Sequence, residues 1–152
     1  MRTELKEIIN EFDLHADDVY VHKTKGWKII KRRGYKAIQV KLGLDIVFDL
    51  AYTDGKDCAV VKAKGYSKSK QVRETYGEAS PKNNTFAYPI AVAQKRAEGR
   101  LILEIADLYR KGWMTEDEID ENVEREKIIS RQDKKSKDAV DATIKAINDS
   151  MA

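Results

Sequence analysis

The sequence predicts an α+β fold in which a three-stranded antiparallel β-meander packs on a long α-helix, a β-β-β-α core with flanking helices. Residues 44–76 contain three β-patterned segments separated by turn residues. Pro89 then begins a stretch whose apolar residues recur every three to four positions, as they do on one face of a helix. The length of 152 residues is close to the most common size of one domain.

The segment before the meander predicts short elements. Apolar residues at three- and four-residue steps indicate an amphipathic helix in the first twelve residues. Short β-prone runs predict strands at 19–21 and 27–30, on either side of a turn. A brief helix is expected at 35–42, because Gly43 stands where a helix commonly ends in a left-handed residue.

The meander itself is expected at residues 44–52, 58–66 and 70–76. Asp54-Gly55 favours a hairpin turn between the first two strands. Alternation in the first strand predicts one apolar face with Ile46, Phe48, Leu50 and Tyr52, and places Asp45 and Asp49 on the other face. A loop over 77–85 then leads to the long helix, which we expect to run from 89 to about 110.

The last forty residues are expected to be helical and to lie outside the core. Thr115 and Glu118 have capping-box spacing, which predicts a helix from there to about 129. A polar linker is expected at 130–137, followed by a final helix with a narrow apolar stripe of Val140, Ile144, Ile147 and Met151. We therefore place a core domain at 1–112 and a helical acidic extension at 113–152.

The charge of the chain is strongly segregated. Residues 19–73 contain 14 Lys and Arg against four Asp, whereas 1–18 and 113–152 each carry a net charge of −4. A basic centre between acidic ends is typical of a protein that binds a polyanion on one surface. The net charge of the whole chain, +3, hides this pattern.

Several function classes have no sequence support. The chain has no P-loop, dinucleotide-binding glycine motif, HExxH or GxSxG. One cysteine, Cys58, and two histidines neither form a disulfide framework nor complete a zinc site, so we expect no metal, no cofactor and no enzymatic activity. No apolar run has the length of a membrane span and no secretory signal is evident, so a cytoplasmic protein that binds no membrane is expected.

Three stretches together resemble a known family: WKIIKRRGYKAIQVKLG at 27–43, YGEAS at 76–80 and QKRAEGR at 94–100. They resemble the Rad-fifty-two type of single-strand annealing proteins, and 77–100 is also similar to phage-encoded relatives. The resemblance implies a homo-oligomeric ring that binds single-stranded DNA in a basic groove and anneals complementary strands without ATP. It implies a role in recombination and DNA repair, in the host-cell cytoplasm if the chain is phage-encoded.

The resemblance also implies which residues bind DNA. Lys95, Arg96 and Arg100 would line the floor of the groove, and the meander would form the other wall. Strand alternation puts Lys62 and Lys64 on one side and Arg73 on the adjacent strand, which predicts a charged face across two strands. Tyr35 and Tyr66 lie near basic residues and are candidates for stacking on bases.

Three alternatives remain at this point. The α-β-β-β-α order also occurs in double-stranded RNA-binding modules. A metal-dependent nuclease would use Asp45 and Asp49, although the second strand lacks the acidic residue that normally accompanies its lysine. An adaptor would bind a partner protein through the final helix and have no affinity for nucleic acid. In an annealing protein, the same helix would bind a single-stranded-DNA-binding protein or another recombination partner.

Overall fold

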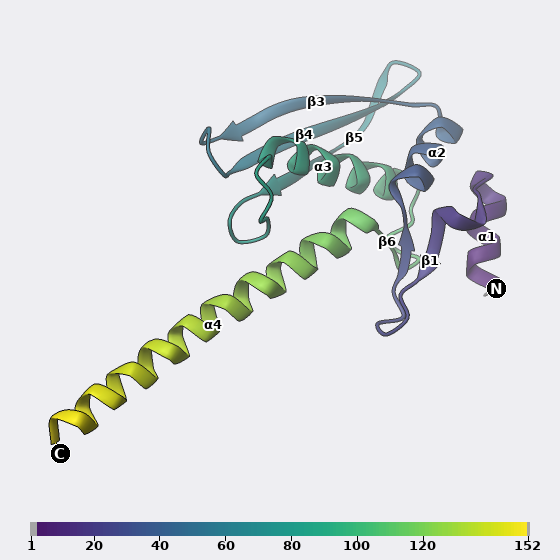
Figure 1. The fold of residues 1–152 in the computed structure, drawn as a ribbon. Coiled ribbons are helices and arrows are strands. Elements are labelled where there is room, and N and C mark those ends of the chain that lie inside the picture. The colour runs from purple at the N-terminus through teal and green to yellow at the C-terminus, as the bar shows by residue number, and fades with distance from the viewer. Residues whose placement is uncertain (1–2, 152) are drawn as a thin grey trace.

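The computed structural model describes residues 3–151, and the side chains of all of these except 120–122 and 124. Its fold is α+β, as predicted, with two three-stranded sheets (Figure 1). In chain order the elements are α1 (Thr3–Phe12), a 3-10 helix η1 (Ala16–Asp18), β1 (Val19–Val21), β2 (Lys28–Ile30), α2 (Arg32–Leu42), β3 (Leu44–Thr53), β4 (Ala59–Ser67), β5 (Lys70–Ala79), α3 (Pro89–Ile105), β6 (Trp113–Thr115) and α4 (Glu116–Met151).

The antiparallel meander β3-β4-β5 packs one face on α3, which confirms the predicted core. Small and branched residues of β4, such as Val61 and Ala63, meet Ala93, Ala97 and Leu101 of α3 in this core. Gly77 allows the closest approach, because a Cβ built there would lie 2.1 Å from the carbonyl oxygen of Ala93. Helix and sheet therefore contact each other almost backbone to backbone at this point.

A second, smaller sheet closes the N-terminal side of the body. β1 pairs antiparallel with β2, and β2 pairs parallel with β6, so the chain returns to this sheet after α3. Trp113 of β6 is only 3% exposed and belongs to the core formed with α1 and α2. The predicted domain boundary after residue 112 is therefore wrong: the packed body includes β6 and continues to Ile119, which is also buried.

A bulge in β3 changes which side chains share a face. The register shifts between Leu50 and Tyr52, so Leu50 pairs with Val61 but Tyr52 pairs with Val60. Val60 and Val61 point to opposite faces of β4, because side chains alternate along a strand. Tyr52 consequently lies on the face away from α3, and the prediction that it shares a face with Ile46, Phe48 and Leu50 is wrong.

α2 ends as its sequence predicts but begins at Arg32, three residues earlier than expected, and an ion pair fixes it to η1. Gly43 ends the helix with a φ of +63°, in the left-handed region. At the other end, Arg33 Nε lies 2.5 Å from Asp18 Oδ1, and the backbone N–H of His15 donates to Asp18 Oδ2 at 2.9 Å. Burial alone would raise the pKa of Asp18, but these two donors outweigh it and hold the pKa below its usual 3.8.

Asp18→Asn is expected to destabilise the protein at neutral pH by about 1–3 kcal/mol, because Arg33 then loses its buried charged acceptor. Since the pKa of Asp18 is lowered in the folded state, its contribution is present above pH 3.8 and is lost as the pH falls through the lowered value. Urea unfolding of both proteins from pH 7 to pH 2 measures this difference. The exposed neighbour Asp17→Asn is the control, and an equal loss there would contradict the prediction.

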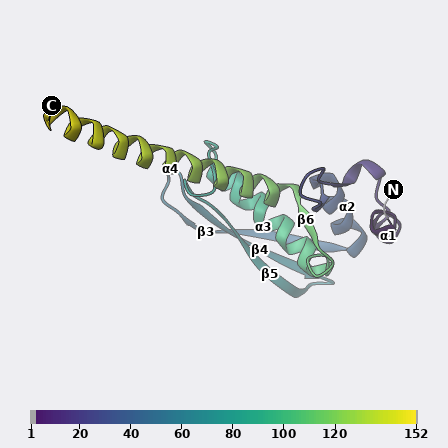
Figure 2. The same cartoon turned by 90° about the horizontal axis from the view of Figure 1, so that it is seen from below.

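The C-terminal region is one helix, α4, and the predicted linker at 130–137 is wrong. Residues 113–152 contain no Gly or Pro, and the polar residues of the expected linker are mostly good helix formers. α3 ends earlier than predicted, at Ile105, because Asp107 has a φ of +59°. The first turns of α4 run beside α3, and the rest projects away from the body with residues 129–151 exposed (Figure 2).

Within 3–151, none of the helices combines the length and apolarity that a membrane span needs.

Candidate nucleic-acid interface

Lys62 and Lys64 lie on the face of the meander that is turned away from α3. Lys64 Nζ is 3.1 Å from Asp49 Oδ2, which raises the pKa of Lys64, and Lys62 Nζ lies 5.4 Å from the ring centroid of Tyr76. The cross-strand partners on this face are Asp49 for Lys62, Glu74 for Lys64, and Asp45 for Tyr66. The face is open to solvent but balanced in charge, so it offers a polyanion little net attraction.

Arg73 lies on the opposite face, which breaks the predicted charged surface across β4 and β5. Arg73 pairs with Gly65, and a Cβ on Gly65 would point at Ile105 and Leu101 of α3. The guanidinium Nη1 of Arg73 accordingly lies 3.6 Å from Glu104 of α3. The expectation that Lys62, Lys64 and Arg73 form one face is wrong.

The three basic residues expected on the groove floor have different environments. Arg96 is 2% exposed, and its two terminal nitrogens donate to Glu78 O, Asn83 O and Asn83 Oδ1. Arg100 is partly buried and donates to Tyr76 O at 2.8 Å and to the Glu78 carboxylate. Lys95 is partly exposed. Arg96 therefore holds the fold together, and the expectation that it lines a DNA groove is wrong.

Tyr35 is fully buried and is not a stacking residue, contrary to the prediction. Its ring lies against Gly99 of α3, and its hydroxyl donates to Asp117 Oδ2 at 2.8 Å. Burial, together with the Asp117 carboxylate, raises the pKa of this hydroxyl. Tyr66, the other stacking candidate, stays partly exposed on the outer face of the meander.

The strongest concentration of positive charge lies on the β1–β2 hairpin and α2. Residues 19–43 carry eight basic residues and no acidic one: Lys23, Lys25, Lys28, Lys31, Arg32, Arg33, Lys36 and Lys41. We call this set the basic surface. The sequence contains this signal, since the segment supplies eight of the ten surplus charges in 19–73, whereas strand alternation predicts the charged face on the meander.

Half of the basic surface is already engaged within the chain. Arg33 pairs with Asp18, Lys36 Nζ lies 3.3 Å from the buried Glu98 carboxylate, and Lys28 donates to the carbonyl of Lys111. Arg32 is 4.0 Å from the same Glu98 oxygen. The other four, Lys23, Lys25, Lys31 and Lys41, form no ion pair with any residue of the described range 3–151.

The tip of the β1–β2 hairpin has a defined geometry. His22 Nδ1 accepts hydrogen bonds from the backbone N–H groups of Thr24 and Lys25, at 3.3 and 3.1 Å. The ring of Trp27 lies 5.5 Å from that of His22, with Lys25 Nζ 5.7 Å from the Trp27 centroid. Similarly, Lys31 Nζ lies 5.6 Å from the centroid of Tyr20. Figure 1 shows this hairpin projecting from the body. The contacts of Lys25 and Lys31 place ammonium groups beside aromatic rings in this segment.

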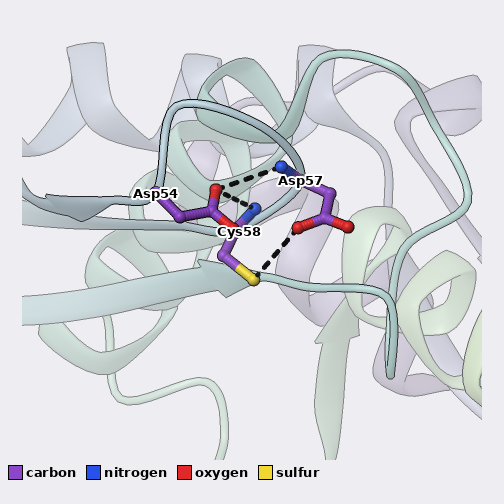
Figure 3. A group of neighbouring side chains, drawn as sticks. All are labelled: Asp54, Asp57 and Cys58. Atoms are coloured by element: carbon purple, nitrogen blue, oxygen red, sulfur yellow. Dashed lines mark hydrogen bonds between the residues drawn. The ribbon is translucent and has the colours of Figure 1, made fainter.

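One cluster of potential metal ligands occurs among the described residues, and it closes the β3–β4 hairpin (Figure 3). Asp54 Oδ1 accepts hydrogen bonds from the backbone N–H groups of Cys58, Lys56 and Asp57 at 2.9–3.1 Å, which lowers the pKa of Asp54. Partial burial and the nearby Asp57 carboxylate raise the pKa of the Cys58 thiol. These contacts make a stable turn and disfavour a reactive thiolate.

Asp45 and Asp49, the residues of the nuclease alternative, are exposed and lie on the outer face of β3. Neither belongs to a cluster of three potential metal ligands among the described residues.

Comparison of the chain with protein-family models, with curated proteins and with solved structures finds no match. The functional argument therefore rests on the geometry and charge described above.

Proposed function

We propose that this protein binds single-stranded DNA through its basic surface and, as a homo-oligomer, anneals complementary strands without ATP. The observation that carries the proposal is the segregation of charge: eight basic residues and no acidic one on the β1–β2 hairpin and α2. Recombination and DNA repair are the processes in which such an activity is used. Their place in the proposal rests on the resemblance to the Rad-fifty-two type.

A polyanion is the ligand that best fits this surface. Lys23, Lys25, Lys31 and Lys41 carry charges that no described acidic group neutralises, and phosphates would neutralise them with release of counterions. Such contacts do not read sequence, because the phosphate is the same in every nucleotide. Annealing requires this property, since the two strands can have any sequence.

The aromatic rings beside the lysines favour a single strand over a duplex. Trp27 lies at the hairpin tip next to Lys25, and Tyr20 lies next to Lys31. Bases of a single strand can stack on such rings, whereas those of a duplex already stack on each other. Equal or stronger binding of duplex RNA than of single-stranded DNA in filter binding would replace the proposal with the RNA-binding alternative.

Annealing breaks no covalent bond, so binding and assembly are the properties that the chain must supply. Each subunit offers four lysines that form no ion pair with a described residue, and an oligomer would repeat them along a bound strand. We propose that the exposed stripe of Val140, Ile144 and Ile147 on α4 serves contacts with other copies or with a recombination partner. Light scattering with and without an oligonucleotide measures the mass of the assembly, and a monomer in both states would contradict the proposed oligomer.

The replacement of Lys23, Lys25, Lys31 and Lys41 by alanine is expected to weaken binding to single-stranded DNA and to reduce its salt dependence. Each lost phosphate contact lowers the slope of log affinity against log salt by about 0.7, so the four changes lower it by up to about 3. Fluorescence titration of a labelled oligonucleotide at several salt concentrations measures both quantities.

A matched control removes the same charge from another surface. Alanine at Lys134, Lys135, Lys137 and Lys145, which are exposed on α4, also changes the net charge from +3 to −1. We expect this variant to keep most of the salt slope of the original protein. Equal losses in the two variants would mean that net charge, and not the basic surface, determines binding.

A further inference from the structure

The loop between β5 and α3 exposes two aromatic rings that are stacked on each other. The centroids of Phe86 and Tyr88 are 5.6 Å apart, and the ring planes differ by 18°. Phe86 is 47% exposed and Tyr88 53%, so neither ring is a core residue. Exposed aromatic side chains cost solvation free energy, and they commonly mark a binding surface when they are held in a fixed position.

Buried polar residues hold this loop in place. Arg96 donates to the carbonyl and side-chain oxygens of Asn83, which is 6% exposed. Asn84 is equally buried; its Oδ1 accepts from the N–H of Phe86 at 3.1 Å, and its Nδ2 donates to the carbonyl of Phe86 at 3.2 Å. The backbone that carries the rings is therefore fixed from inside, although the rings face outward.

Two hollows meet at Tyr88, and each contains a lysine. The first, of about 130 Å³, is lined by Phe86, Tyr88, Val92, Lys95, Arg96 and Asp117. The second, of about 590 Å³, includes Lys56, Tyr88, Pro89, Ile90 and Gln94. Lys95 thus shares a hollow with both rings, and Lys56 shares one with Tyr88. Aromatic rings beside lysines suit a single-stranded nucleic acid, because the rings stack on bases and the ammonium groups contact phosphates.

We infer that Phe86 and Tyr88 form a base-stacking site for single-stranded DNA, with Lys95 and Lys56 placed to contact the adjoining phosphates. The inference rests on the proposed function and assigns part of the bound strand to a second place on the molecule, separate from the basic surface. The flanking lysines favour a nucleic acid over an apolar protein segment, which would leave both ammonium groups without a partner.

The test compares two strands with equal phosphate charge. One is an oligothymidylate of about 20 nucleotides, and the other is an abasic strand of the same length. The original protein is expected to bind the base-bearing strand at least about tenfold more tightly, because stacking requires the base. In Phe86→Leu/Tyr88→Leu this preference is expected to fall at least about fivefold, and what remains comes from Trp27 and Tyr20. The salt slope stays unchanged because no phosphate contact is lost.

Matched variants separate stacking from general effects. Tyr88→Phe keeps the ring and is expected to keep the preference. Tyr52→Leu/Tyr76→Leu removes two equally exposed rings from the outer face of the meander, and it too is expected to keep the preference. Thermal unfolding of each variant establishes that it folds, and the single change Tyr88→Leu provides the test if the double variant does not.

Each outcome has a defined meaning. If Phe86→Leu/Tyr88→Leu retains the full preference for bases, or if the original protein binds both strands equally, the stacking site is overturned while DNA binding by the basic surface stands. If the original protein binds neither strand, the proposed function and the stacking site are overturned together. A loss of preference confined to the Phe86 and Tyr88 variants supports the site.

Discussion

Gly77→Ala is expected to destabilise the protein by about 3 kcal/mol or more, because a Cβ at this glycine meets closer neighbours than at any other glycine of the chain. The new Cβ would lie 2.1 Å from the carbonyl oxygen of Ala93 and 2.4 Å from the amide nitrogen of Ala97. Both are backbone atoms of α3 and cannot move aside as a flexible side chain would. The helix must shift away from β5, which opens the core that they share.

Chemical denaturation followed by circular dichroism measures this loss. The control is Gly43→Ala, because Gly43 has a φ of +63° but open space around its Cβ position. That change costs only the strain of a left-handed alanine, about 1–2 kcal/mol. Equal denaturation midpoints for the two variants would show that α3 does not lie against β5 as described.

Arg96→Met is expected to have the second largest effect, a loss of about 3 kcal/mol or more. Methionine retains much of the length of the side chain but none of its donors, so the carbonyl oxygens of Glu78 and Asn83 lose the donor that Arg96 supplies. The Asn83 side-chain oxygen loses one of its donors and keeps the backbone N–H of Ser80. The loop that carries Phe86 and Tyr88 would loosen as well. Denaturant unfolding and proteolysis of this loop measure the two consequences.

Lys95→Met is the matched control, since Lys95 adjoins Arg96 in the chain but is partly exposed. Its stability is expected to change by no more than about 0.5 kcal/mol, whereas its affinity for single-stranded DNA should fall. An Arg96→Met protein that is as stable as the original but unable to bind DNA would contradict the structural role assigned to Arg96. It would show that Arg96 contacts DNA.

Much of the fold was predictable because it is specified by neighbouring residues. Gly43 ends α2 as expected, and Thr115 and Glu118 exchange the two hydrogen bonds of a capping box at the start of α4. Features that depend on distant segments were missed. Three residues of β6 are too few for a strand signal, and only their pairing with β2 makes them one.

The candidate site was predictable in charge but not in position. The composition identifies the basic segment, 19–73. The sequence does not show whether a given lysine or arginine is exposed, ion-paired or buried. Arg96 and Lys95 are adjacent in a basic run, and only the carbonyl groups around Arg96 separate their roles. The sequence does not indicate Phe86 and Tyr88 as binding residues, because the loop that exposes them is held by Arg96, ten residues farther along the chain.

The projecting part of α4 also affects how the molecule diffuses. Residues 130–151, all exposed, extend roughly 33 Å at 1.5 Å per residue. A packed body of this size has a radius of gyration of roughly 13–14 Å, so the projecting part of the helix is longer than that radius. Rotation about axes across the helix meets more friction than rotation about its length. A 17.4 kDa chain of this shape tumbles anisotropically and sediments more slowly than a sphere of equal mass.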